Sequence, residues 1–240
     1  MNDTFNQYQY DDLKARGHDL YAAAKFQIIF DYLRGKESLR ILNAGCGSGE
    51  LSFMLANAGH TIVGIDPAAE YIELAKRQLA PEFSNRCIFA VDTIEDHKAN
   101  SLYDCAIVTD VLEHIKDDQG ALAKLRELVR PGGLIIIAVP ALPALFGYHD
   151  EALGHFRRYT KRTLKALILA AGLNLEHSRY FGFSLLPIAW LYSKVWRRPY
   201  PVAAAGRASF LNNTLKFLLA VEQRAHTPLG TSLIAIARKL

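Results

Sequence analysis

Cysteine is scarce in this sequence, and the few cysteines present stand alone. The 240 residues include three, Cys46, Cys87 and Cys105, and no two of them form a C-x-x-C pair. This spacing indicates neither a zinc site nor a disulfide framework. Residues 1–12 are polar and acidic, without the basic start and apolar core of a secretory signal. Both observations predict a protein of the reducing cytoplasm.

Dense runs of positive charge and long apolar runs are missing as well. The net charge is +4, and Lys and Arg do not gather in a stripe, so we expect no nucleic-acid partner. The apolar stretch 181–198 is interrupted by Pro187 and Lys194 and is too short to span a bilayer. Half of the residues are hydrophobic and 22% are charged, as in ordinary globular proteins. The length predicts a single domain over residues 1–240.

Residues 39–66 organise the rest of the chain. An apolar run ends at three glycines, Gly45, Gly47 and Gly49, and an apolar helix and a second strand follow. Glycine is needed where the backbone turns sharply and a ligand approaches closely. The second strand ends at Asp66, whose carboxylate can accept two hydrogen bonds from a ribose diol. The pattern predicts a nucleoside-binding βαβ unit at the carboxyl ends of parallel strands.

Strands and helices alternate through the remaining sequence, which predicts an α/β fold with a mostly parallel sheet. The pattern of residues 230–238 resembles that of a last, edge strand. Further strands are predicted at 87–91, 103–109, 134–139 and 174–180, and helices at 18–34, 50–58, 67–79, 117–130, 161–171 and 210–225.

Four further signals follow the glycine loop in a fixed order. They are Asp66, Asp92, the segment Asp-Val-Leu-Glu-His at 110–114 and the segment Arg-Pro-Gly-Gly at 130–133. With the glycine loop, this series resembles the successive motifs of class I S-adenosylmethionine (SAM) dependent methyltransferases over residues 39–140. The resemblance implies a Rossmann-like, seven-stranded sheet with helices on both faces. It also implies an antiparallel last strand and a helical insertion between strands six and seven.

The resemblance further implies SAM as cofactor, with S-adenosylhomocysteine as product. The glycine loop would pass under the methionyl part, Asp66 would hold the ribose, and Asp92 would receive the adenine amino group. Asp66 could instead cap the following helix, Asp92 could be a turn residue and Asp110 a cap or a solvated residue. The set of implied cofactor contacts is Asn43, Gly45, Cys46, Gly47, Gly49, Asp66, Pro67, Asp92, Thr93, Ile94, Asp110 and Val111.

Asn43 departs from the family, which usually has aspartate at this position. Asparagine keeps the hydrogen-bonding capacity and loses the charge. We therefore expect weaker cofactor binding rather than loss of function.

Residues 141–160 follow a central strand and are rich in His, Arg and Tyr. They resemble a segment, H-D-x-x-x-G-H-x-R-R-Y, of a bacterial methyltransferase subgroup. Arg158 and Asp150 could instead pair to pin the loop, and Thr160 is a candidate N-cap. The catalytic candidates are His114, His149 and His155, and the candidates for substrate binding are Tyr148, Asp150, Arg157, Arg158 and Tyr159.

The domain is thus divided into an N-terminal flap and helix (1–35), a SAM-binding core (36–140), a substrate loop (141–160) and a helical cap insertion (181–228). The insertion carries Trp190, Trp196, Arg197 and Arg198 in its first part. This part could be a lid, a homodimer face or a peripheral membrane contact.

The hypothesis is a metal-independent SN2 transfer of the SAM methyl group to a small or lipid-like acceptor, with a hydroxyl as the expected site. No metal-ligand motif is visible. One alternative is a nucleic-acid methyltransferase, although the N-P-P-Y and Pro-Cys signals are absent after residue 109. Another is a catalytically inactive SAM-binding partner subunit. The glycine spacing disfavours a nicotinamide oxidoreductase.

Overall fold

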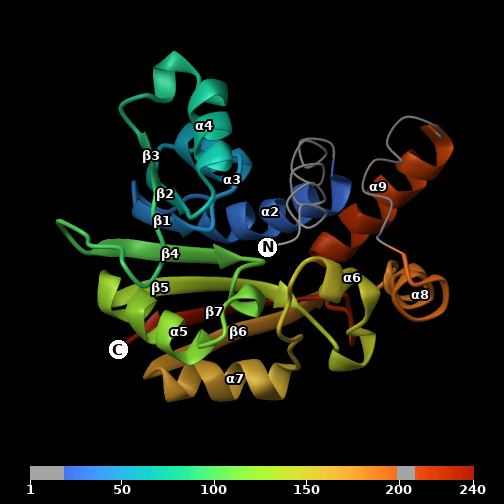
Figure 1. The fold of residues 1–240 in the computed structure, drawn as a ribbon. Helices are drawn as coiled ribbons and strands as arrows, with labels where there is room; N and C mark the ends of the chain where they lie inside the picture. Colours follow the sequence, from blue (N-terminus) through green and yellow to red (C-terminus); the bar gives the residue numbers. More distant parts are fainter. Residues whose placement is uncertain (1–18, 199–208) are drawn as a thin grey trace.

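The computed structural model describes residues 19–198 and 209–240. The predicted flap at 1–17 lies outside the described residues. The described chain forms one seven-stranded sheet with strand order β3-β2-β1-β4-β5-β7-β6 (Figure 1). The strands are β1 (Arg40–Ala44), β2 (Thr61–Asp66), β3 (Cys87–Val91), β4 (Tyr103–Thr109), β5 (Val129–Pro140), β6 (Leu173–Phe181) and β7 (Ser232–Lys239).

Strands β1 to β5 pair in parallel, whereas β7 runs antiparallel to both of its neighbours. The mostly parallel sheet and the antiparallel last strand are therefore confirmed. The expectation that residues 230–238 form an edge strand is wrong. β7 lies between β5 and β6, and its residues from Ser232 to Ala237 are buried on both faces. A strand that is apolar on both faces suits the sheet interior, and β6 with polar Glu176 and Arg179 takes the edge.

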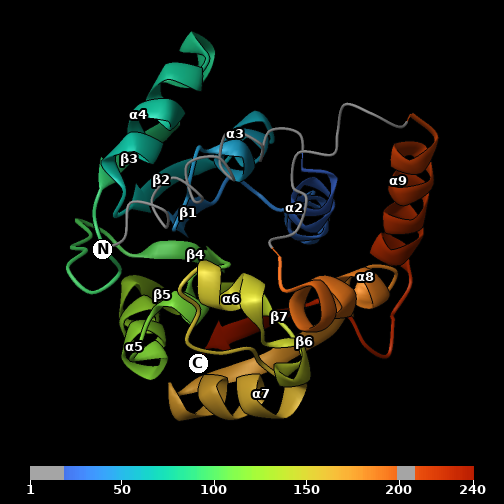
Figure 2. The same ribbon diagram turned by 45° about the vertical axis from the view of Figure 1, so that its right-hand side comes forward.

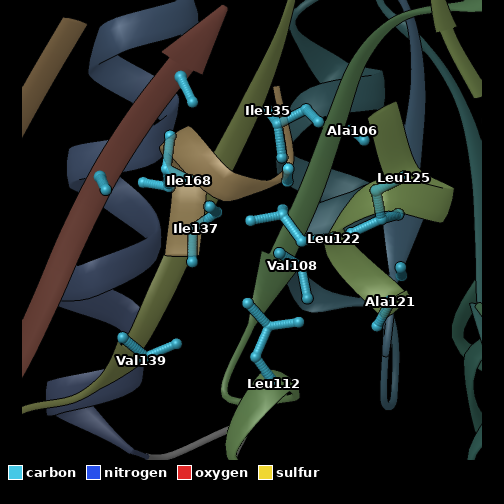
Figure 3. Close-up of a cluster of buried hydrophobic side chains, with 14 of the residues drawn as sticks. Ala106, Val108, Leu112, Ala121, Leu122, Leu125, Ile135, Ile137, Val139 and Ile168 are labelled. Atoms are coloured by element: carbon cyan, nitrogen blue, oxygen red, sulfur yellow. The ribbon is translucent and has the colours of Figure 1, made fainter. Parts of the chain in front are cut away.

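Helices cover both faces of the sheet, as expected (Figure 1). One face is covered by α5 and α7, and the other by α2, α3 and α4. Figure 3 shows part of the first cluster, in which Val108 and Ile137 from neighbouring strands pack with Leu122 of α5. These helices are α2 (Leu20–Leu33), α3 (Glu50–Asn57), α4 (Ala69–Gln78), α5 (Asp118–Leu128) and α7 (Lys161–Ala170).

Strand β5 begins earlier than predicted, and the preceding helix is shorter. Helix α5 ends at Leu128, and β5 starts at Val129 rather than at residue 134. Val129 pairs with Tyr103 before the register shifts and Cys105 pairs with Leu134. The Pro-Gly-Gly sequence thus forms an irregularity inside the strand, not a loop before it.

The insertion between β6 and β7 is helical, as predicted. It holds α8 (Leu186–Trp190), the π-helical turn η4 (Leu191–Trp196) and α9 (Ser209–Arg224). Helix α9 packs beside α2 through a small cluster that includes Leu219 and Ala24, and Figure 2 shows both helices at the same side of the sheet. Among the described residues, none of the helices has both the length and the apolar character needed to cross a bilayer.

The connections between these elements carry three 3₁₀ turns and one short helix. They are η1 (Pro81–Phe83), η2 (Leu112–His114), η3 (Pro143–Leu145) and α6 (Tyr148–Ala152). Because η2 and α6 follow β4 and β5, they lie at the edge of the sheet where α/β proteins bind ligands.

Candidate functional site

The glycine loop after β1 has the backbone conformation that its three glycines predicted, and it packs closely on the segment after β4. Gly45, Gly47 and Gly49 all have positive φ, at 72°, 53° and 92°, a region that favours glycine. A Cβ atom on Gly45 would overlap the side chain of Val111, which follows β4. The loop is therefore pressed against the segment 110–114.

Asp66 holds this loop in place. Its carboxylate is buried, and Oδ2 accepts a hydrogen bond from the Gly47 amide at 3.0 Å. Oδ1 accepts one from the Ala68 amide, also at 3.0 Å, before α4 begins. This second bond closes a turn ahead of α4, whose N-cap is Ala68 and has no side-chain cap hydrogen bond. The helix-capping alternative for Asp66 is therefore wrong, and the ribose contact stays a prediction. Pro67, next to it, is exposed.

Asn43, near the end of β1, has a hydrogen bond at only one of the two polar atoms of its side-chain amide. Its Nδ2 donates to Ser52 Oγ at 2.9 Å, while Oδ1 is buried without a hydrogen-bond partner among the described residues. A buried acceptor left without a donor costs about 1–3 kcal/mol. A ligand that donates a hydrogen bond to Oδ1 would remove this cost, and the amine of SAM is such a donor. The cofactor contact of Asn43 stays a prediction.

Cys46 is a packing residue within the loop. It is 7% exposed, and its sulfur packs so closely on β2 that a Cβ atom on Gly64 would lie 3.0 Å from it. Burial raises the pKa of the Cys46 thiol, and the nearby Asp66 carboxylate raises it further. The thiol is therefore not a nucleophile, and only its backbone is open to the cofactor role.

The adenine end of the predicted site lies after β3. Asp92 Oδ1 accepts from the Thr93 amide at 2.9 Å, and Oδ2 contacts His97 Nδ1 at 2.7 Å. Ile94 is buried in the core below this turn. The sequence analysis did not single out His97, which lies in a loop without helical or strand periodicity.

A buried lysine that was also missed contacts the segment after β4. Lys25 of α2 is 3% exposed and forms an ion pair with Asp110, which has a strained φ of 54°. Burial acts to lower the pKa of Lys25, but Asp110, together with Tyr21 and Glu113, raises it by more, so that the pKa is raised overall. Lys25 could have been recognised in the sequence as a charged residue on the apolar face of the predicted helix 18–34.

Two of the predicted histidines meet beyond Asp110. The rings of His114 and His155 form an edge contact with centroids 4.5 Å apart. Close to both lies Glu113, which is fully buried and has no hydrogen-bond partner for either carboxylate oxygen among the described residues. Burial raises the pKa of Glu113 well above its usual value, and Asp110 adds to this effect.

One ligating atom from each of Glu113, His114 and His155 lies within 4.8 Å of the others. Imidazole nitrogens and a carboxylate are a set that a divalent cation could use, or that could pass a proton. No metal site is predicted from the sequence, because the two segments that supply these residues are far apart in the chain.

Asp150 anchors the substrate loop. It is fully buried, and Oδ1 accepts hydrogen bonds from His155 Nδ1 at 2.9 Å and Arg158 Nε at 2.7 Å. Oδ2 accepts one from the Gly147 amide at 3.0 Å. Burial would raise the pKa of Asp150, but these donors lower it to about 2. The pinning pair that was left open as an alternative therefore exists, and it also orients His155.

The other loop candidates divide into two groups. Burial lowers the pKa of His149 to about 3, so its imidazole is neutral, while Tyr148 is 38% exposed. Arg157 and the buried Tyr159 both bind Asp118 Oδ2 of α5, each at 2.8 Å. These last two side chains hold the loop against α5 rather than joining the cluster at His155.

The sequence is similar to those of known methyltransferases. The methyltransferase domain family matches residues 15–178. A ubiquinone biosynthesis O-methyltransferase of Methylocella silvestris is 40% identical over 188 residues, covering 72% of this chain and 73% of that protein. One of the same name from Rhizobium etli is 34% identical over 105 residues, which is 44% of this chain and 42% of the relative. The chain thus matches less than half the length of this second relative.

Solved structures share the fold. A SAM-dependent methyltransferase from Mesorhizobium loti has a TM-score of 0.65 at 15% identity, over 92% of this chain and 100% of that one. A 1,6-didemethyltoxoflavin-N1-methyltransferase from Burkholderia thailandensis, with 1,6-didemethyltoxoflavin and S-adenosylhomocysteine bound, has a TM-score of 0.58 at 20% identity over 97% and 89% of the two chains. The predicted fold class is confirmed.

The close approach at Gly45 generates a first prediction. Gly45→Ala places a Cβ atom against Val111 in addition to straining a positive φ, so we expect it to abolish S-adenosylhomocysteine binding. Gly35→Ala is the matched control, because Gly35 has a φ of 76° and nothing within 4 Å of the added atom. It should cost about 1–2 kcal/mol of stability, the usual penalty for a side chain at a positive φ, and leave binding intact. Calorimetric titration of both variants checks this, and equal affinities would contradict it.

The depressed pKa of Asp150 generates a second prediction, for stability against pH. The stabilisation by the ionised carboxylate is complete above the pKa of an unfolded aspartate, about 4. It is lost as the pH falls towards about 2. We expect wild type to exceed Asp150→Asn in unfolding free energy by roughly 2 kcal/mol more at pH 7 than near pH 2. Urea unfolding at several pH values measures the difference, and a difference independent of pH would be the contrary result.

Proposed function

The chain belongs to the class I SAM-dependent methyltransferase family, and from that premise we propose that it methylates a hydroxyl on a small or lipid-like acceptor. The observation that carries the proposal is the pairing of buried Asp150 with His155, beside the segment against which the glycine loop packs. The O-methyltransferase name of the relative at 40% identity supports the same reaction. A phenolic hydroxyl is the acceptor of this class that we favour.

The residues after β1, β2 and β3 would hold the cofactor. The glycine loop and Asn43 would receive the methionyl part, Asp66 the ribose, and Asp92 with Thr93 the adenine. SAM supplies, when bound, a methyl group that is already electrophilic. The protein therefore has to align the acceptor oxygen and exclude water, and orientation does most of this work.

His155 is the group that we assign to the acceptor proton. Its Nδ1 is engaged by Asp150, which leaves Nε2 to accept the proton of a hydroxyl. Because the pKa of Asp150 is about 2, its carboxylate is ionised at neutral pH. The charge stabilises the imidazolium that forms. The ring of His114 contacts that of His155. We assign contact with the acceptor to the neutral His149 and the exposed Tyr148.

The third prediction follows from this assignment. His155→Asn keeps an amide donor near the position of Nδ1 and removes Nε2, so the Asp150 contact and the fold should survive. We expect turnover of a catechol with radiolabelled SAM to fall about 10²–10⁴-fold, with S-adenosylhomocysteine affinity unchanged. His177→Asn, at an exposed site on β6, is the control and should keep full activity. Wild-type turnover in His155→Asn would overturn the assignment.

The apolar insertion next to the substrate loop supports a peripheral membrane contact. Ile188, Trp190 and Trp196 are 46%, 53% and 50% exposed, and Arg197 and Arg198 follow them. Exposed apolar and aromatic side chains beside basic ones suit the surface of an anionic bilayer. The helix turn η4 touches the substrate loop, because Lys194 Nζ donates to the Phe146 carbonyl. A lipid-like acceptor could therefore enter from a membrane.

The fourth prediction tests this surface by sedimentation with vesicles. Wild type should bind vesicles of phosphatidylcholine and phosphatidylglycerol more than phosphatidylcholine alone, and Trp190→Glu should lose binding several-fold. Ile88→Glu, at an isoleucine 61% exposed on β3, is the control. No vesicle binding by wild type would reject the membrane contact. A dimer that Trp190→Glu dissociates would assign the surface to a homodimer instead.

A further inference from the structure

A line of three hydrogen-bonded side chains runs from the end of β3 into the core. Asp92 Oδ2 contacts His97 Nδ1 at 2.7 Å, and His97 Nε2 contacts the Tyr103 hydroxyl at 2.9 Å. The side chain of Asp92 is 28% exposed and that of His97 is 9% exposed. Tyr103, at the start of β4, is 1% exposed. Only the carboxylate end of the line is therefore open to a ligand.

The carboxylate fixes the direction of the first hydrogen bond. An ionised carboxylate can only accept, so His97 Nδ1 carries the proton and donates to Asp92. In the neutral imidazole, Nε2 is then an acceptor for the Tyr103 hydroxyl. Burial raises the pKa of Tyr103, which keeps the hydroxyl protonated. The Arg40 guanidinium lies 4.2 Å from the centroid of the tyrosine ring and helps to hold it.

The carboxylate is thereby held from two sides. His97 occupies Oδ2, and the Thr93 amide donates to Oδ1 at 2.9 Å. A carboxylate oxygen has two lone pairs, so Oδ1 can accept one more hydrogen bond. A fixed acceptor of this kind forms a hydrogen bond with an amino group and repels an oxygen at the same position. It therefore discriminates between two bases that differ in this group more strongly than the shape of the site alone.

We propose that His97, braced by Tyr103, is a positioning residue that sets selectivity for adenine over hypoxanthine in the cofactor. This inference rests on the proposed function, since it takes Asp92 as the group that receives the adenine amino group. His97 itself does not touch the cofactor. It acts by keeping one oxygen of Asp92 aimed at the base.

The test compares the binding of S-adenosylhomocysteine with that of S-inosylhomocysteine, in which an oxygen replaces the amino group. Wild type should prefer the adenine compound by roughly 10- to 100-fold, on the scale of a hydrogen bond to a charged group. His97→Ala should reduce this ratio to within about threefold of one. His97→Asn keeps a donor at the position of Nδ1 and should keep most of the ratio. Tyr103→Phe should give an intermediate ratio.

The control separates selectivity from stability. His60 is another buried histidine, 2% exposed, and it accepts a hydrogen bond from the Leu39 amide at the far end of β1 and β2. His60→Ala should lower stability and leave the binding ratio unchanged. A wild-type ratio in His97→Ala, or no preference in wild type, overturns the inference. Failure of wild type to bind S-adenosylhomocysteine at all would instead reject the proposed function.

Discussion

The substrate side of the site depends on the buried carboxylate of Asp150. It has three donors, from Gly147, His155 and Arg158, and it is completely shielded from water. Removing one partner from a buried charge of this kind costs several kcal/mol. The donors therefore cannot move independently. Arg158 also donates to the Ala141 carbonyl at 3.3 Å, so the loop takes its position from the end of β5.

The segment 110–114 joins this loop to the cofactor side. Gly45 packs against Val111 on one side, and the Glu113 carbonyl accepts a hydrogen bond from the Phe156 amide at 2.8 Å on the other. The positive φ of Asp110 bends the chain between these contacts, and its ion pair with Lys25 brings in α2. The segment 110–114 therefore contacts both the glycine loop and the substrate loop.

The sequence predicts those features that depend on the order of residues within one stretch of the chain. The glycine loop, the parallel strands and Asp66 were predicted because apolar runs and turn residues are read along the chain. It did not predict Lys25, His97 or the approach of Glu113 to His155. Those contacts join segments that only the folded sheet brings together. β7 was misplaced for a related reason, since alternating small and large apolar residues do not reveal which strands lie on either side.

The place of β7 has a consequence for how the chain is assembled. Strands β5 and β6 do not pair with each other: β6 pairs only with β7, whereas β5 pairs with β4 on one side and with β7 on the other. During synthesis, β1 to β5 can pair as they emerge, but β6 must wait for a strand made more than 50 residues later. Until then the exposed side of β5 is an open edge, able to pair with other chains. The sheet therefore closes late, after β7 has been synthesised. The insertion that separates β6 from β7 docks at the same stage.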